Sequence, residues 1–194
     1  SMDEDRNRNL FPPFDPKLAK EYFAQGLQEL GISLDSISLH FPTGIVDRRL
    51  AQVLQQKWEE ILGIRVQLEQ RDFKTHKNIL HNREYEIALA HWIAQYQDPI
   101  NILERFKSRL NAKNYPAWED RDFSHWLDLA QNAIHLNDRK ELIDLAEERL
   151  AECCPLIPLY HWSAPSLTHP RVQNLQTTPS GGILFERCWI SANF

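Results

Sequence analysis

Apolar residues along this chain follow two spacings, one typical of amphipathic helices and one typical of strands. The first helical run begins after Asp15-Pro16 and stops at Gly31. Asp at the N-cap, Pro at the first helical position and Gly after the last turn are favoured at helix ends. The apolar positions between them, spaced as on one face of a helix, are Leu18, Tyr22, Phe23, Leu27 and Leu30. We therefore predict a helix between Asp15 and Gly31.

Strand-like alternation follows in SISLHF, residues 36–41, where every second residue is apolar. This alternation is typical of a half-buried strand. A second helical stripe then ends at Gly63, and its apolar members are Leu50, Val53, Leu54, Trp58, Ile61 and Leu62. Alternation returns in IRVQLEQ, residues 64–70, so this part predicts a strand, a helix and a second strand.

The next two elements complete a repeating order. A shorter helix is predicted from Phe73 to about His81, and the run YEIALAHW, residues 85–92, is apolar or small at nearly every position. Such a run is typical of a strand buried on both faces. Helical crossovers of this length allow the three strands to pair in parallel. We therefore predict an α/β fold with a mixed, mostly parallel sheet flanked by helices.

The second half of the chain is predicted to be mainly helical. Asp98-Pro99 offers a new helix start, and a further apolar stripe lies within residues 123–134. Asp138 and Glu141 resemble a capping box that opens a last helix.

The end of the chain has fewer apolar residues at regular spacing. PLIPLYHW, residues 155–162, predicts a short strand, and Pro158 places it at a sheet edge or at a strand start. From Ser163 onward the chain is rich in Pro, Thr, Ser and Gly, with one strand-like piece, ILFERCWI of residues 183–190. This segment is expected to have little core of its own.

Composition narrows the class of protein. The 194 residues are 42% hydrophobic and 25% charged, as in ordinary globular domains, and they suffice for a sizeable core. The net charge of −5 argues against a nucleic-acid partner, which would call for a basic stripe. No apolar run is long enough to span a bilayer, and no secretory leader is visible. Ser1-Met2 before the polar DEDRNRN is typical of a cloning scar, so we expect an excised fragment.

The sequence offers no convincing catalytic constellation. Eight histidines invite a metal hypothesis, but spacings such as His76 with His81 or His161 with His169 match no zinc motif. PSGG at residues 179–182 lacks the Lys-Ser/Thr of a phosphate loop, and no G-x-S-x-G elbow is present. We therefore predict a protein that is not an enzyme and that needs no cofactor or metal.

The three cysteines leave two alternatives open. Cys153 and Cys154 are neighbours, so at most one bridge, to Cys188, is possible. The alternative is that they are small buried side chains.

Trp92 lies where the predicted third strand ends. In parallel α/β sheets, ligands bind in the crevice beyond the carboxyl ends of the strands. Its position alone is equally compatible with a ligand contact and with a ring packed under the following helix.

Four segments in order resemble the oligopeptide, dipeptide and nickel solute-binding proteins of bacterial ABC transporters, known as family 5. The order of these segments is specific, although no single one is decisive. They are FDPKLAKEYFAQGLQELG (14–31), LAQVLQQKWEEILGIRVQLEQRDFKTH (50–76), YEIALAHWIAQYQDPINIL (85–103) and RKELIDLAEERLAECCPLIPLYHWSAPSLTHPRVQNL (139–175). The resemblance covers about residues 13–190.

The resemblance implies a lobe of the type II periplasmic-binding-protein fold, from the carboxyl-terminal portion of a two-lobed protein. Residues 1–14 are then a leader or linker, 15–167 the ligand-binding lobe, and 168–194 a segment that crosses back to the other lobe. The implied partners are a peptide or small solute, the permease subunits of an ABC transporter and the missing amino-terminal lobe. The implied location is the periplasm or an anchored position on the cell envelope.

In this family the strand ending in Trp and the loop after it line the cleft, and their backbone pairs with an extended ligand. Carried over, the ligand-binding residues are His91, Trp92, Ile93, Ala94 and Gln95. Peptide-binding members place an Asp at the position of Gln95, where it holds the free α-amine of the ligand. Because Gln95 is uncharged, we expect this protein to have lost or relaxed recognition of a free amino terminus.

Two other classes of function remain. The same lobe can be the ligand-sensing domain of a transcriptional regulator, and the sequence upstream of residue 1 would separate the two. A small α/β hydrolase is favoured only by the histidines, and a metal-content measurement would test it.

Overall fold

The computed structural model describes residues 10–161, 163, 166–178 and 181–192. The chain forms two compact units. The first comprises residues 1–91 and 109–118, and the second comprises residues 92–108 and 119–194.

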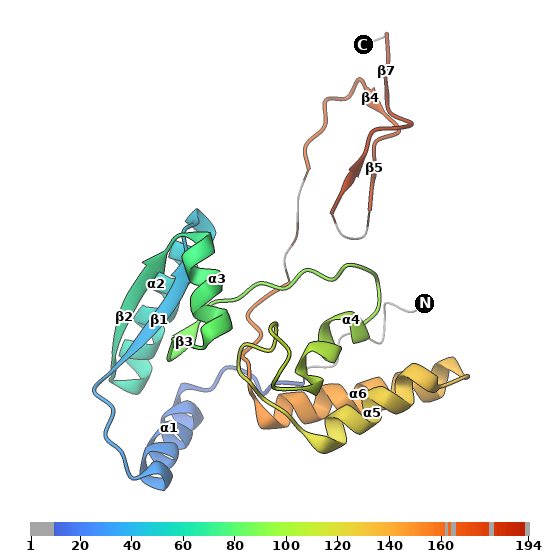
Figure 1. Ribbon diagram of the computed structural model, residues 1–194. Coiled ribbons are helices and arrows are strands. Elements are labelled where there is room, and N and C mark those ends of the chain that lie inside the picture. Colours follow the sequence, from blue (N-terminus) through green and yellow to red (C-terminus); the bar gives the residue numbers. More distant parts are fainter. Residues whose placement is uncertain (1–9, 162, 164–165, 179–180, 193–194) are drawn as a thin grey trace. The chain divides into compact units, whose positions relative to one another are not determined.

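The first unit is built on a three-stranded parallel sheet with the order β2-β1-β3 (Figure 1). The strands are β1 (Ser36–Pro42), β2 (Arg65–Arg71) and β3 (Ile87–Ala88). The helices of this unit are α1 (Pro16–Leu30), α2 (Ile45–Leu62) and α3 (Phe73–Asn82). The predicted α/β class and parallel pairing are confirmed.

Local capping explains why the helix ends were predictable. Asp15 Oδ1 accepts from the backbone N–H groups of Lys17 and Leu18, each at 3.0 Å, and so caps α1. Gly31 and Gly63 end α1 and α2 with φ of 65° and 72°, in the left-handed region that glycine adopts without strain.

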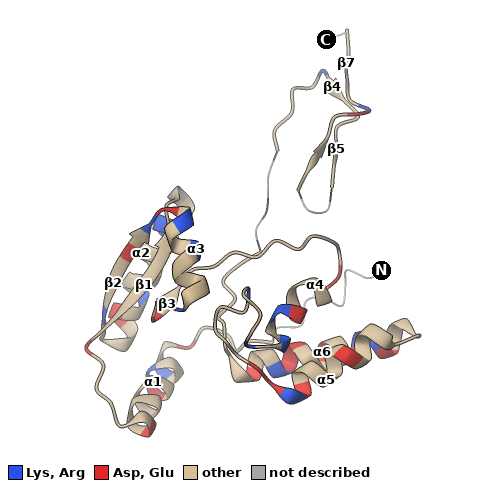
Figure 2. Ribbon diagram, viewed as in Figure 1, with Lys and Arg blue, Asp and Glu red and all other residues tan. Residues whose placement is uncertain are grey.

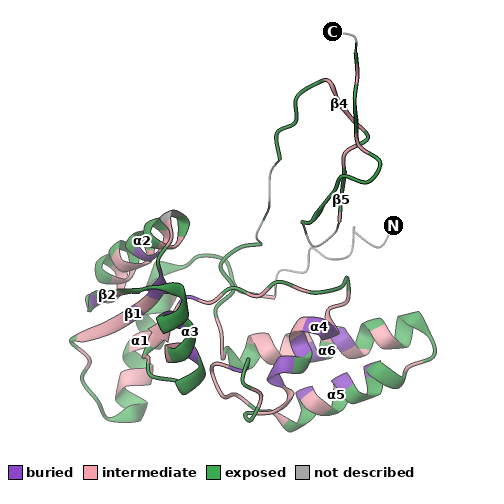
Figure 3. Ribbon diagram, turned by 45° about the horizontal axis from the view of Figure 1, so that its top comes forward, coloured by how far each residue is buried: buried purple, intermediate pink, exposed green. Residues whose placement is uncertain are grey.

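The core of this unit lies between the sheet and α2, and Figure 3 shows buried positions there. Its buried members are Leu39, Phe41, Ala51, Ile64, Val66 and Leu89. Trp58 packs against this cluster, as its place on the stripe predicts. Val53 is 55% exposed, so the predicted apolar stripe of α2 is too wide at that position.

The third strand is much shorter than predicted. The sequence predicts a doubly buried strand over residues 85–92, whereas β3 contains only Ile87 and Ala88, both partly exposed. Just before β3, the side chain of Glu86 takes the place of a backbone partner for β1. Its Oε2 accepts from Ser38 N at 2.7 Å and from Ser38 Oγ at 2.6 Å. These bonds lower the pKa of Glu86. Trp92 is therefore not at a strand end.

The second unit is mainly helical, as predicted. Its helical elements are α4 (Ile100–Leu103), the 3₁₀ segment η2 (Glu104–Lys107), α5 (Arg121–Asn132) and α6 (Leu136–Cys153). α5 and α6 pack together, and the buried side chains of this unit include Phe106, Phe123, Leu127, Ala130, Ile143 and Ala146. The predicted capping box is wrong, because α6 begins with His135 as N-cap and Asp138 already lies in its first turn.

The remainder of this unit contains two short antiparallel pairs. They are β4 (Val172–Gln173) with β7 (Trp189–Ile190), and β5 (Gln176–Thr177) with β6 (Ile183–Leu184). The predicted strand over residues 155–162 is wrong for its described part, residues 155–161, which have no regular structure. Two prolines in that segment lack the N–H that a ladder needs. Residue 162 lies outside the described residues.

The distribution of charge agrees with the prediction from the sequence, whereas the exposure of the cysteines differs from it in part. Figure 2 shows acidic and basic residues intermingled on α2 and α6, not gathered into a basic stripe. Cys153 and Cys154 are exposed thiols, so the reading of these two as buried side chains is wrong. Cys188 is a partly buried thiol, and no bridge joins the three. None of the described helices combines the length and the hydrophobicity that a membrane span requires.

Asp120 joins α5 and α6, the two long helices of the second unit. Its Oδ1 caps α5 by accepting from Phe123 N at 2.9 Å, and its Oδ2 accepts from Arg149 Nη2 of α6 at 3.0 Å. The Phe123 N–H, followed by Arg149, lowers the pKa of Asp120. We expect Asp120→Ala to lower the free energy of unfolding by about 2 kcal/mol, because it removes both interactions.

Asp120→Asn keeps an acceptor for Phe123 and loses only the charge, so we expect about half of that loss in urea denaturation. Asp122→Ala, at an exposed first-turn position of the same helix, is the control. Equal stability of the Asp120→Ala and Asp122→Ala variants would contradict this role for Asp120.

Candidate ligand-binding site

The five residues predicted to line a ligand site are divided between the two units. His91 ends the first long segment of the first unit, whereas Trp92, Ile93, Ala94 and Gln95 belong to the second. Whether these five residues bind a ligand remains a prediction.

In the first unit, His91 is anchored by an acid at the carboxyl edge of the sheet. Its Nε2 lies 2.5 Å from Asp47 Oδ1, in the first turn of α2. The carboxylate accepts, so Nε2 carries the proton. Gly44, the N-cap of α2, leaves room for this carboxylate, because a Cβ there would lie 2.4 Å from Asp47 Oδ2. Asp47 was not predicted from the sequence, where its only signal is its place at a helix start after a strand.

A second histidine fixes the backbone just before the candidate segment. His76 of α3 is 3% exposed, and its Nε2 lies 2.8 Å from the carbonyl oxygen of Leu89. The N–H of Leu89 donates to the carbonyl of His40, also at 2.8 Å. Burial lowers the pKa of His76, so the neutral imidazole donates from Nε2 to Leu89. Both backbone groups of Leu89 are therefore held inside the first unit.

In the second unit, Trp92 packs against Phe106 of η2. Their ring centroids are 6.0 Å apart and their planes make an angle of 70°, an edge-to-face arrangement that aromatic pairs favour. Phe106 is buried and Trp92 partly buried. The alternative considered for Trp92, packing against the following helical segment, thus describes one of its contacts.

The residues after Trp92 combine exposed side chains with a tied backbone. Ile93 is 69% exposed, Ala94 is partly buried and Gln95 is exposed. The N–H of Gln95 donates to Asn101 Oδ1 at 2.8 Å. Asn101 is a buried polar residue that the sequence did not single out. This part of the loop can offer side chains to a ligand without losing its own shape.

Asp98 holds the far end of the loop. Its Oδ1 accepts from Ile100 N at 2.9 Å, and its Oδ2 lies 2.6 Å from Arg139 Nη2 on α6. The predicted helix start at Asp98-Pro99 is confirmed, because α4 begins at Ile100.

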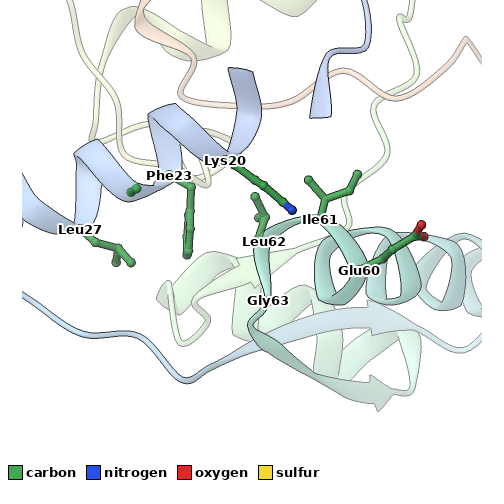
Figure 4. Close-up of a pocket in the computed structure, with 8 residues that line it drawn as sticks. Lys20, Phe23, Leu27, Glu60, Ile61, Leu62 and Gly63 are labelled. Atoms are coloured by element: carbon green, nitrogen blue, oxygen red, sulfur yellow. The ribbon is translucent and has the colours of Figure 1, made fainter. Parts of the chain in front are cut away.

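Among the described residues, no group of three His, Cys, Asp or Glu side chains could hold a metal ion. An open hollow of about 470 Å³ lies between α1 and α2 in the first unit (Figure 4), and residues around it include Phe23, Leu27 and Leu62. It includes none of the five predicted residues.

Comparison with known proteins decides the family. The sequence pattern described as "Bacterial extracellular solute-binding proteins, family 5 Middle" matches residues 2–114, more than half of the chain. The chain belongs to this family. The resemblance noted from four sequence segments is thereby confirmed, and the family is one of binding proteins.

Curated relatives of this family 5 chain include two proteins of Bacillus subtilis (strain 168). The oligopeptide-binding protein OppA is 28% identical over 190 residues, which cover 96% of this chain and 35% of the relative. The dipeptide-binding protein DppE is 26% identical over 176 residues, which cover 90% of this chain and 32% of the relative. The chain therefore spans about a third of the length of these relatives.

Solved structures confirm the fold of this family 5 chain. The pheromone receptor PrgZ superposes with a TM-score of 0.81 over 95% of this chain and 36% of its own, at 20% identity. A dipeptide-binding protein from Pseudoalteromonas sp. SM9913, in complex with Met-Leu, gives a TM-score of 0.74 over 94% of this chain and 37% of its own, at 24% identity. The type II binding-protein fold expected from the sequence is confirmed.

The buried His76 predicts a dependence of stability on pH. The folded state keeps His76 neutral at a pH where the unfolded chain, with its ordinary pKa of 6.5, already takes up a proton. The stabilisation is therefore complete above about pH 6.5 and is lost as the pH falls through the lower pKa of the folded state. His76→Gln keeps a donor for Leu89 and cannot be protonated, so the free energy of unfolding should depend less steeply on pH.

Urea denaturation at a series of pH values from about 7.5 to about 5 measures this slope. His125→Gln, at an exposed position of α5, should leave the slope unchanged. An identical slope in the wild type and the His76→Gln variant would contradict this role of His76.

Proposed function

We propose that this chain is the ligand-binding lobe of a solute-binding protein of a bacterial ABC transporter. The protein captures an extended peptide or a related solute in a cleft between two lobes and delivers it to permease subunits. The family match is the observation that carries this proposal, because it spans residues 2–114 and includes the whole candidate segment. The names of the relatives OppA and DppE, oligopeptide-binding and dipeptide-binding, support peptides as the ligand class.

The candidate segment has the properties of one wall of such a cleft. Its backbone leaves the sheet after Leu89, and Ile93 and Gln95 are exposed in the following loop. An extended peptide can pair with such a backbone as an added strand does, which tolerates many ligand side chains. In this proposal residues 15–167 form the lobe, residues 168–194 cross back to the other lobe, and an amino-terminal lobe supplies the opposite wall. One wall alone would bury too little of a ligand for tight binding.

The proposed location follows from the family. Its members are described as extracellular solute-binding proteins, and several relatives are named as periplasmic, such as OppA of Salmonella typhimurium. We place this protein outside the cytoplasmic membrane, in the periplasm or anchored to the cell envelope.

Gln95 narrows the ligand within this class. A carboxylate at this position would form a charge-assisted bond with the α-ammonium of a peptide, about twice as strong as a neutral bond. Gln95 can accept a hydrogen bond through its carbonyl oxygen and carries no charge. The proposed ligands are therefore peptides with a blocked amino terminus, cell-wall fragments or other solutes for which a free amine gives no advantage.

The proposal predicts weak discrimination between a free peptide and its N-acetylated form. In calorimetric titrations of the full-length protein, we expect the two affinities to differ by less than about tenfold, because no charge pair is lost on acetylation. Gln95→Asp should shift this ratio toward the free peptide by about tenfold or more, as a new charge pair forms.

Gln97→Asp, an exposed acid introduced two residues away in the same loop, is the matched control and should change the ratio little. A strong preference of the wild type for free peptides, unchanged by Gln95→Asp, would refute the idea about the amine. Failure of free peptides, acetylated peptides and muropeptides alike to bind would refute the ligand class itself.

A further inference from the structure

A buried amide lies directly beneath the loop that carries Gln95. Asn101, in the short helix α4, is 5% exposed. A buried amide is stable only where its polar atoms find partners. Its Oδ1 accepts from the backbone N–H of Gln95 at 2.8 Å, six residues earlier in the chain.

The position of Asn101 is itself fixed by the rest of the second unit. Its N–H donates to the carbonyl of Asp98 at 3.0 Å. Asp98 in turn caps Ile100 N at 2.9 Å and pairs with Arg139 of α6 at 2.6 Å. Asn101, whose Oδ1 accepts from Gln95, therefore lies at the start of α4, which Asp98 links to α6 through Arg139.

The bond to Asn101 has a direct consequence for what Gln95 can offer. The backbone N–H of Gln95 is used inside the protein, whereas its side chain is exposed. A ligand that pairs with this loop as an added strand would not find that N–H as a donor. It would meet the side chain of Gln95, which projects from a backbone position that this bond fixes.

We propose that Asn101 is a positioning residue of the ligand site. It fixes the backbone from which the Gln95 side chain projects and withholds the Gln95 N–H from a ligand, so that contact with the amino terminus of the ligand depends on the Gln95 side chain. This inference rests on the proposed function. Asn101 is an additional residue of the proposed site, and it acts only through Gln95.

Two substitutions separate positioning from simple loss of structure. Asn101→Ala removes the acceptor and frees the Gln95 N–H. Asn101→Asp has nearly the same shape and keeps an oxygen that accepts from this N–H, so it serves as the conservative variant for amide exchange. Because it adds a charge, it is not used in the comparison of ligands. Leu103→Ala is the matched control, because Leu103 is equally buried at 5% exposure in the same helix and its side chain makes no hydrogen bond.

The first measurement is residue-resolved hydrogen–deuterium exchange of the Gln95 amide in the full-length protein without ligand. We expect this amide to be protected in the wild type and the Asn101→Asp variant, and to exchange about tenfold faster in the Asn101→Ala variant. In the Leu103→Ala variant, the Gln95 amide should keep more of its protection than in the Asn101→Ala variant. An unprotected Gln95 amide in the wild type would overturn the inference whether or not any peptide binds.

The second measurement is the ratio of affinities for a free peptide and its N-acetylated form. We expect Asn101→Ala to change this ratio by about fivefold or more. Leu103→Ala should weaken both peptides alike and leave the ratio unchanged. An unchanged ratio in the Asn101→Ala variant, although the wild type binds peptides, would overturn the positioning role alone. Absence of binding by the wild type would instead overturn the proposed function, so the two failures can be told apart.

Discussion

The fixed backbone of Leu89 is the constraint on which the candidate site depends. Its N–H donates to His40 and its carbonyl accepts from the buried His76, so that β1 and α3 together determine where the chain leaves the sheet. Leu89 also fills the apolar core, with 6% of its surface exposed. One residue thus joins the sheet, a helix and the core directly before the candidate segment. The first residue of that segment, His91, is held in the same unit by Asp47.

Helix ends were predictable because their signals are local. Asp15, Gly31 and Gly63 act on residues at most four positions away, and each ends or begins a helix where the sequence indicates. The parallel order of the strands also followed, since helical crossovers allow it. The length of β3 did not follow, because Glu86 replaces a backbone acceptor for Ser38, which is 48 residues away in the chain. An apolar run cannot reveal that a side chain takes over part of a ladder.

The candidate site was predictable only as a stretch of sequence. Family resemblance indicated His91 to Gln95 but not the side chains that hold these residues. Asp47 binds His91 across 44 positions, and Asn101 binds Gln95 through a turn whose geometry depends on the start of α4. Both supporting residues are ordinary polar residues of helix starts when read in the sequence. Their roles depend on three-dimensional contacts with an exposed loop, which no periodicity encodes.

The acids near this segment bear directly on what it can bind. Between Trp92 and Asp98 the sequence contains no acid other than Asp98 itself. Asp98 is already paired with Arg139 and caps α4, so binding a ligand ammonium would require it to give up both interactions. Asp47, in the other unit, is likewise engaged by His91. Breaking a charge-assisted pair to form another yields little net free energy. If Gln95 contacts the ligand as proposed, Asp98 therefore does not replace the missing charge, and neutral recognition is what residues 92–98 themselves can supply.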